Sequence, residues 1–286
     1  MKKTLILGVA LMLLIPALTA FGGQRKVLKV GVQMFENKIF DPAASYNNRT
    51  AQYHINLHDG LVRLSTMGVP YKVLPALATS WKEISPTVTE FKLRQGAKFW
   101  DGTYITAEDV KWSLERSINQ DHPAYSSAFG RVLYNFEKVE IVNASTVRVH
   151  NRRPDPLKYV MLAQTPSSIL SKKAFDAAAS PEDFFLSPVG AGPYRSAEFK
   201  QDQYVKFESW DGYWGEKPPL EELWYYGIKE PTARITALVN GEVDFIVDIP
   251  PDMKSAMDGK KGIKSQGVTL DMMYVWFMNM TRNPVN

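Results

Sequence analysis

Alternating apolar and polar side chains predict most of the strands in this chain. Residues 27–32 (VLKVGV) and 87–93 (TVTEFKL) follow this pattern over their whole length, which is typical of a strand with one buried face. The same alternation predicts two hairpins, at residues 139–149 and 194–210, each with a polar turn in the middle. Apolar runs predict three further strands, at residues 223–228, 243–247 (which we expect to be buried) and 271–280.

The clearest helix signal begins at Thr106. Its hydroxyl can cap the first turn, and Glu108 and Asp109 place negative charge where the helix dipole favours it. Apolar residues between positions 110 and 118 supply a buried face. Shorter helices are expected in the first part of 51–64 and ending at Gly60, in the second half of 72–81, and at 157–162, 169–179, 232–240 and 250–257.

Residues 187–194 (SPVGAGPY) interrupt these patterns. Pro188 and Pro193 each fix φ and remove a backbone donor, and Gly190 and Gly192 permit backbone angles that other residues resist. We therefore expect a rigid crossover between two parts of the chain. A phosphate cradle is not favoured, because no Val/Ile-rich strand precedes the glycines and the second proline blocks the start of a helix.

The first twenty residues have the pattern of a secretory signal peptide. Lys2 and Lys3 precede an apolar run at 5–18, and small residues around Ala20 offer a cleavage site. The run is too short for a membrane anchor. No cysteine follows it, which excludes a lipid-anchored lipoprotein. We expect export to the periplasm of a Gram-negative bacterium.

Composition narrows the classes of function further. The absence of cysteine excludes a disulfide framework, thiolate metal ligands and a cysteine nucleophile. The formal charge of +4 comes from dispersed basic residues with acids between them, whereas a nucleic-acid surface would show clustered Lys and Arg. Aromatic residues at 12%, with seven tryptophans, fit either a large core or a cleft that stacks ligands.

Several segments, taken in order, resemble the family 5 extracellular solute-binding proteins of ABC importers, the oligopeptide, dipeptide and nickel-binding type. Each segment alone is modest, but their order along the chain is specific. The segments are DGLVRL (59–64), LATSWK (77–82), FKLRQGAKFWDGTYITAEDVKWSLER (91–116), SPVGAGPY (187–194), WDGYWGEKPPLEELWYYGI (210–228), TARITALVNGEVDF (232–245) and the FMNMTRNP run near the end.

This resemblance implies an α/β fold of the periplasmic binding protein type (class II, cluster C). After a signal peptide at 1–20, residues 21–58 and 189–286 would build the first lobe, and residues 59–188 an inserted α+β accessory lobe. Family members are roughly twice this long, so the second ligand-binding lobe is expected to be missing. Such proteins are clamps that close on a ligand by hinge motion.

The resemblance also implies the function and the partners. The chain would bind peptides, or similar small solutes, and deliver them to inner-membrane ABC permease subunits. It would act as a monomer, without catalysis, cofactor, metal or nucleic acid. Nickel chelates, sugars and opines stay open as ligands. The residues expected in the ligand site are Asn48, Arg49 and Thr50 in the long loop 33–50, Tyr125 in the accessory lobe, and Tyr274, Trp276 and Asn279 in the last strand.

Each of these residues has a plainer interpretation. Arg49 could bind a peptide carboxylate bidentately, or it could lie in a solvated turn. Tyr125 could reach the ligand, or it could be a surface aromatic on a loop. Tyr274 and Trp276 could line a strand edge that pairs with an extended peptide, or they could share one packed face.

Other functions find less support in the sequence. His54 and His58 have the spacing of helical zinc ligands, but no glutamate lies between them and no third ligand is evident; we expect two partly exposed imidazoles. The acids near Thr106 are explained by a turn and a helix cap. A secreted hydrolase would need a GxSxG or HExxH pattern, and neither occurs. A ligand-sensing clamp subunit of a signalling system remains an alternative.

Overall fold

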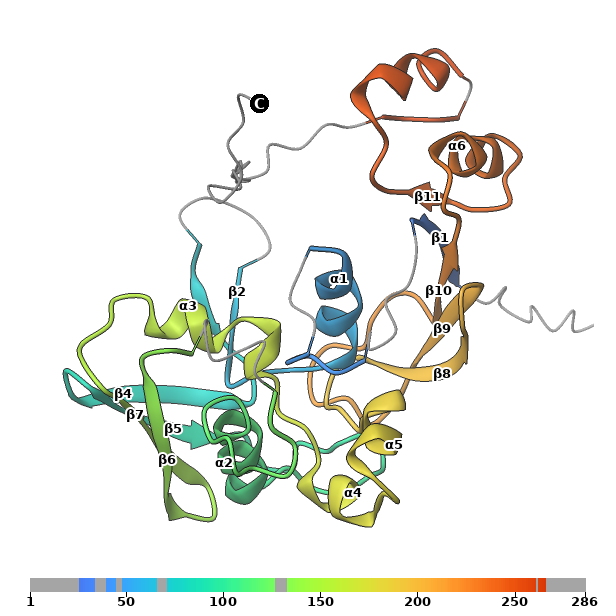
Figure 1. Cartoon of the computed structure of the whole chain (residues 1–286). Helices are drawn as coiled ribbons and strands as arrows, with labels where there is room; N and C mark the ends of the chain where they lie inside the picture. Colours follow the sequence, from blue (N-terminus) through green and yellow to red (C-terminus); the bar gives the residue numbers. More distant parts are fainter. Residues whose placement is uncertain are drawn as a thin grey trace, which may run out of the picture.

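The computed structural model describes residues 26–33, 40–44, 48–65, 71–126, 133–260 and 262–265. Within these residues the strands form a five-stranded, a four-stranded and a two-stranded sheet. In Figure 1 helix α1 (Asn48–Leu57) lies between the two larger sheets, with the five-stranded sheet on the right. No helix in the described ranges is long and apolar enough to cross a membrane.

The five-stranded sheet has the order β11-β1-β10-β9-β8. Strand β1 is parallel to β10 and β11, whereas β8, β9 and β10 are antiparallel neighbours. The predicted strand at 27–32 and the predicted hairpin at 194–210 are confirmed. The bounds are β1 Val27–Val32, β8 Tyr194–Lys200, β9 Tyr204–Ser209, β10 Glu222–Gly227 and β11 Phe245–Ile246.

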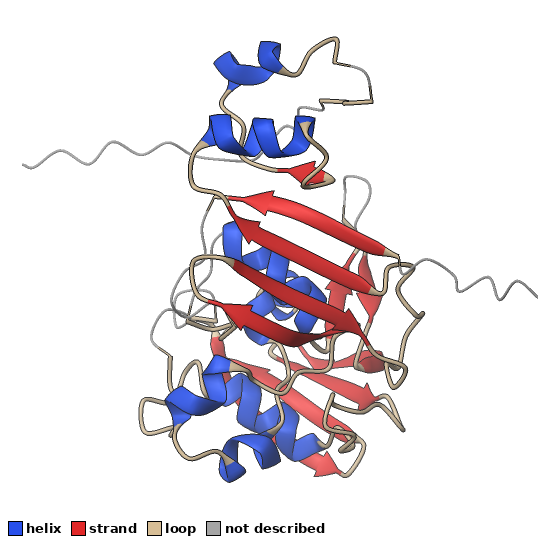
Figure 2. Ribbon diagram, turned by 90° about the vertical axis from the view of Figure 1, so that its right-hand side faces the viewer, coloured by secondary structure: helices blue, strands red, loops and turns tan. Residues whose placement is uncertain are grey.

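Helix α1 covers one face of this sheet. The ring of Tyr53 lies edge-on to Tyr225, with centroids 4.9 Å apart, and to Phe207 at 6.3 Å, while Leu57 is buried. Figure 2 views the sheet from its other face, with α1 behind the strands. The alternating apolar residues of the strands thus point towards the helix and form one core. Helix α6 (Pro231–Val239) connects β10 to β11, and the 3-10 helix η3 (Pro251–Ala256) follows β11.

The four-stranded sheet is antiparallel, in the order β4-β5-β7-β6. Helix α2 (Ala107–Glu115) packs on it through Val110 and Leu114, which share a core with Phe91 and Val147. The bounds are β4 Ala78–Ser85, β5 Val88–Leu93, β6 Phe136–Asn143 and β7 Thr146–Asn151, with β2 Val62–Leu64 and β3 Val73–Pro75 in the two-stranded sheet.

Short helices fill the chain between β7 and β8. The predicted helix at 169–179 begins only at Lys172, because the hydroxyl of Ser171 accepts a hydrogen bond from the amide of Ala174 and caps it. The bounds are α3 Lys158–Leu162, η2 Thr165–Ser167, α4 Lys172–Ala177 and α5 Pro181–Leu186.

The predicted cap of α2 is confirmed in detail. The amide of Asp109 donates to the Thr106 hydroxyl at 3.2 Å, and the amide of Thr106 donates to the Asp109 carboxylate at 2.9 Å. This reciprocal pair is a capping box, which satisfies two backbone donors at the helix start. The preceding turn has Gly102 at φ +82°, as an Asp-Gly turn requires.

Three expectations are wrong. Residues after Pro75 form no helix, because β4 pairs with β5 and places Trp81 opposite Phe91; tertiary pairing overrides local helix propensity. Helix α1 begins earlier than expected and ends at Leu57, before Gly60. Strand β11 is two residues long at the sheet edge, and Phe245 is 55% exposed rather than buried.

Candidate ligand-binding site

Two chain crossings connect the part of the chain around the five-stranded sheet with the part around the four-stranded sheet. They lie backbone against backbone, and the amide of Gly192 donates to the carbonyl of Leu57 at 3.1 Å. A Cβ at Gly192 would lie 2.4 Å from the Leu57 carbonyl carbon, and one at Gly190 would lie 2.4 Å from Nδ1 of His58. Neither glycine has a left-handed φ, so the expectation of unusual backbone angles is wrong. Glycine is needed at these positions because a side chain would collide with residues 56–58.

Three tryptophans fasten these crossings. The indole N–H groups of Trp100 and Trp210 both donate to the carbonyl of Gly192, at 3.2 and 2.9 Å. The indole N–H of Trp214 donates to the Asp59 carboxylate at 2.9 Å, on the other crossing. The waist, as we call residues 57–60 and 187–193 together, is therefore held by side chains as well as by backbone contact.

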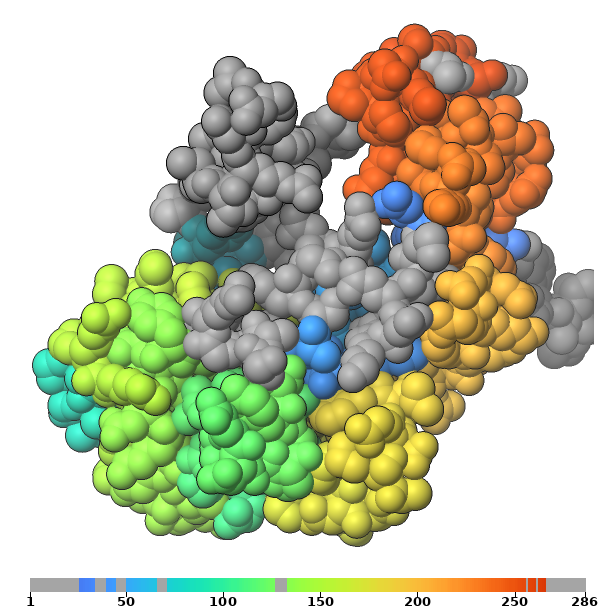
Figure 3. Space-filling model, viewed as in Figure 1, coloured from blue at the N-terminus to red at the C-terminus, as the bar shows by residue number. Residues whose placement is uncertain are grey.

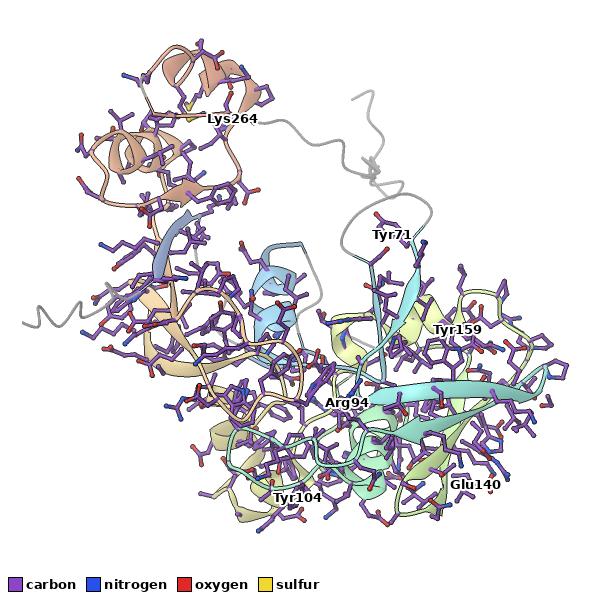
Figure 4. All side chains as sticks on the ribbon, turned by 180° about the vertical axis from the view of Figure 1, so that it is seen from behind. Tyr71, Arg94, Tyr104, Glu140, Tyr159 and Lys264 are labelled. Atoms are coloured by element: carbon purple, nitrogen blue, oxygen red, sulfur yellow. The ribbon has the colours of Figure 1, made fainter. Side chains whose placement is uncertain are left out.

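The buried carboxyl group of Asp59 has a raised pKa. Burial raises its pKa to about 6, and the hydrogen bonds from Trp214 and Tyr213 oppose that rise only in part. The guanidinium of Arg94 stacks on the Trp214 ring, 4.3 Å from its centroid, a favourable cation–π contact. Figure 4 shows Arg94 near the middle of the molecule, close to the waist.

His54 and His58 are buried, which corrects the expectation of partly exposed imidazoles. They are 0% and 4% exposed, and their rings stack with centroids 5.6 Å apart. Burial lowers the pKa of His54 to about 4, although Asp41 opposes the change. Burial and the neighbouring His54 hold the pKa of His58 well below its usual range. Both rings are therefore neutral at pH 7.

The surroundings of these two histidines are those of packed protein. Among the described residues, no three His, Cys, Asp or Glu side chains are grouped so that they could hold an ion. The Nε2 of His58 lies 3.3 Å from the carbonyl of Phe40, and its ring also stacks on Trp100 at 5.9 Å. The pair is therefore part of the packed interior where α1 meets the waist.

The structure describes four of the seven predicted ligand residues at least in part. Asn48 and Arg49 lie in the first turn of α1 rather than in a loop, and their side chains are outside the described part. Thr50 is 1% exposed, and Tyr125 is 36% exposed. The remaining three residues, Tyr274, Trp276 and Asn279, lie outside the described residues.

One surface hollow of the described residues lies elsewhere. It has a volume of about 450 Å³ and lies beside the start of α2, where Tyr104, Glu108 and Ile141 contribute to its lining. In Figure 4 Tyr104 lies at the lower edge of the molecule, away from the waist. None of the predicted ligand residues lines this hollow.

Comparison with known proteins assigns the chain to a protein family. The family model described as bacterial extracellular solute-binding proteins, family 5 middle, matches residues 72–286. The chain belongs to this family. The mixed α/β architecture of this solute-binding protein agrees with that assignment.

Two curated relatives illustrate the range of the family. The chain is 31% identical to the dipeptide-binding protein of Escherichia coli K12 over 191 residues, which is 60% of this chain and 35% of that protein. It is 27% identical to the glutathione-binding protein GsiB of the same strain over 280 residues, 97% of this chain and 52% of the relative. This solute-binding protein thus spans about half or less of the length of these relatives.

Solved structures support the same fold. The periplasmic binding protein DppA from Helicobacter pylori, in complex with the peptide STSA, superposes with a TM-score of 0.75 at 24% identity, covering 83% of this chain and 50% of that one. MoaA from A. tumefaciens R10, in complex with mannopinic acid, gives a TM-score of 0.69 at 27% identity, covering 77% and 44%. The fold of this family 5 protein is thereby shown.

The sequence interpretation missed Arg116 and the burial of its partner. Arg116 stands in the recognised segment 91–116 and Asp41 in the loop before α1, and the two form a bidentate buried ion pair. The Asp41-Pro42 pair signalled only a turn. No local pattern links two positions 75 residues apart, so only the fold could bring them together.

Proposed function

We propose that this chain is part of the periplasmic substrate-binding component of an ABC importer. It binds peptides or similar small solutes in a cleft between lobes and delivers them to permease subunits of the inner membrane. Membership of family 5, from the match over residues 72–286, carries this proposal. The mature protein acts as a monomer in the periplasm, after removal of the signal peptide at 1–20, and performs no catalysis.

Peptides are the favoured ligand class. The curated relatives are named for dipeptide and glutathione binding, and one structural neighbour holds a tetrapeptide. An opine is the second candidate, because MoaA, at 27% identity, holds mannopinic acid. A sensing subunit that presents the same ligands to a membrane partner would use the same clamp.

The proposed lobes follow the two larger sheets. Residues 21–58 and 189–286 would form the first lobe, and 59–188 the accessory lobe. Two apolar clusters support this division: one centres on Tyr53, Phe207 and Tyr225, and the other on Phe91 and Leu114.

The proposed ligand wall combines residues from three places. Tyr125 offers a partly exposed ring, and the start of α1 offers the side chains predicted to meet ligand backbone. Thr50 is buried, so it would shape the wall from within. The residues of the wall are Asn48, Arg49, Thr50, Tyr125, Tyr274, Trp276 and Asn279.

Thermal melting with and without a mixed library of di- to pentapeptides tests this function. A ligand that binds only the folded state adds RT ln(1 + [L]/Kd) to the free energy of unfolding, which is about 2.7 kcal/mol at a hundredfold excess over Kd, and the melting temperature rises accordingly. We expect a rise with peptides and none with free sugars. A cooperative melt that no peptide or opine shifts would contradict the proposal for this chain.

A further inference from the structure

The side chain of Arg116, just after α2, holds two segments that are distant in sequence. Its Nη1 and Nη2 donate to Oδ1 and Oδ2 of Asp41 at 3.0 and 2.8 Å, and its Nε donates to the carbonyl of Ala124 at 2.9 Å. The Arg116 and Asp41 side chains are 2% and 7% exposed. The Phe185 ring lies 4.4 Å from the guanidinium carbon, so the group is enclosed on that side too.

The two segments are also bonded to each other. The hydroxyl of Ser126 donates to the carbonyl of Ala43 at 3.0 Å, and the amide of Ser126 donates to the carbonyl of Arg116 at 3.3 Å. The amide of Ala43 donates to the Asp41 carboxylate at 2.9 Å. Residues 40–44, 121–126 and the end of α2 therefore form one hydrogen-bonded unit. In Figure 3 blue atoms of the early chain lie against the green atoms of this region.

Both segments lead directly to predicted ligand residues. Tyr125 follows Ala124, and its amide donates to the carbonyl of His122 at 2.9 Å, so its backbone is fixed on both sides. The turn at 40–44 precedes α1, whose first turn contains Asn48, Arg49 and Thr50. Arg116 thus bonds both to the segment that carries Tyr125 and to the turn that precedes α1.

We infer that Arg116 is a positioning residue of the ligand site, which fixes Tyr125 and the approach to α1 as parts of one wall. This inference rests on the proposed function. A guanidinium presents its donors in a rigid planar fork, so it can hold a carboxylate bidentately and a carbonyl at the same time. Lysine has a compact charge without that fork. Because the site is buried, water cannot replace the lost bonds.

The test uses Arg116→Lys and Arg116→Met in the 286-residue chain. Hydrogen–deuterium exchange reports on residues 40–44 and 121–126, and calorimetric titration with the mixed di- to pentapeptide library reports affinity. We expect exchange in both segments to become at least tenfold faster, and affinity to fall at least tenfold, in both variants. Wild-type exchange and affinity in Arg116→Lys would overturn the inference, because charge alone would then suffice.

A matched control separates positioning from general loss of stability. Lys158→Met breaks an ion pair with Glu83 at 2.9 Å, in which the lysine is 8% exposed, on the four-stranded sheet. We expect this variant to melt earlier but to keep wild-type exchange in the two segments and wild-type affinity. Equal changes in the control and in the Arg116 variants would overturn the inference.

Two further arms keep the outcomes distinct. If the Arg116 variants do not fold, Ser126→Ala removes the direct bond between the segments; faster exchange confined to them supports the inference, and unchanged exchange overturns it. If the wild-type chain binds no peptide, the proposed function fails while the exchange measurement still decides whether Arg116 fixes the segments. If the wild-type chain binds and Arg116→Lys binds equally well despite faster exchange, only the inference fails.

Discussion

At the residue scale, His54 brings a neutral imidazole into the interior beside an ion pair. Neither of its ring nitrogens has a hydrogen-bond partner among the described residues. The ring stacks on His58 and lies near Asp41, whose charge favours its protonation. In the unfolded chain the same ring titrates near its ordinary pKa of 6.5. The folded protein therefore resists protonation that the unfolded chain accepts.

This difference predicts a loss of stability in acid. The pKa of His54 is lower in the folded state, so its contribution is fully present above pH 6.5 and is lost as the pH falls towards 4. The loss reaches on the order of 3 kcal/mol by pH 4, at 1.36 kcal/mol for each pKa unit. Urea unfolding of the wild type and of His54→Leu at pH 7, 5.5 and 4.5 measures it, and we expect the difference between them to shift in favour of the variant in acid.

Asp59 acts in the opposite direction. Its raised pKa of about 6 means that the folded state binds a proton before the unfolded chain does, so this group adds stability as the pH falls from 6 towards 4. Comparing the wild type with His54→Leu cancels this contribution, since both proteins contain Asp59. Parallel pH profiles of the two proteins would show that His54 titrates normally in the folded state.

At the scale of the element, α2 depends on its cap. Thr106→Ala removes the acceptor for the Asp109 amide and the partner of the Asp109 carboxylate, and such a loss costs about 1 kcal/mol. Asp109 also accepts from the amide of Lys172 at the start of α4, so the cost should reach the upper part of the usual range. Chemical denaturation measures the change.

The cap of α5 provides the control. Ser180 accepts from the amide of Asp183 at 3.1 Å, but the pair is exposed and the helix has six residues. Ser180→Ala should therefore cost less than Thr106→Ala. Equal costs would mean that the buried position of α2 adds nothing to its cap.

The same scale shows why some elements are predictable from sequence and others are not. Strands β1, β5 and the β8–β9 hairpin carry their own alternation, and α2 carries its own cap, so local patterns suffice. In strand β4 buried and exposed residues do not alternate, so no local pattern marks it as a strand. Its pairing with β5 decides its conformation. Strand β11 is limited by its place at the sheet edge.

The candidate site was less accessible to sequence reasoning. The resemblance selected Tyr125 and the start of α1, but it could not show that Thr50 is buried or that α1 begins at Asn48. The Arg116–Asp41 pair joins a recognised segment to the loop before α1 across 75 residues, and its geometry exists only in the fold. Likewise, the spacing of His54 and His58 shows that they share a helix face, but not that this face is internal.

At the scale of the whole molecule, the contacts of the waist hold the five-stranded and the four-stranded sheets together. Gly192→Ala would place a Cβ 2.4 to 2.6 Å from backbone atoms of residues 56–58, none of which can rotate away. Overpacking costs about 1–3 kcal/mol, and a rigid backbone obstacle places this variant at the upper end of that range. We expect a lower melting temperature and, because the crossings must separate, a broader transition in calorimetry.

Gly102→Ala is the comparison for that variant. Gly102 has φ +82° but no atom within 4 Å of an added Cβ, so alanine would meet backbone strain without collision, at about 1 kcal/mol. The two variants separate conformational freedom from close approach. A Gly192→Ala protein that melts like Gly102→Ala would show that the crossings can move apart cheaply.

The contact between Gly192 and Leu57 also bears on how such a gene can change. The chain leaves the part around the five-stranded sheet at Leu57, the end of α1, and comes back at Gly192, two residues before β8, where the two backbones share a hydrogen bond. Once the ends of such a segment meet, each doubling of its length adds only about 0.6 kcal/mol to the cost of loop closure. Evolution can therefore enlarge, shorten or exchange the intervening segment without redesigning the sheet, provided that each new version arrives at the same carbonyl with a residue that lacks a side chain.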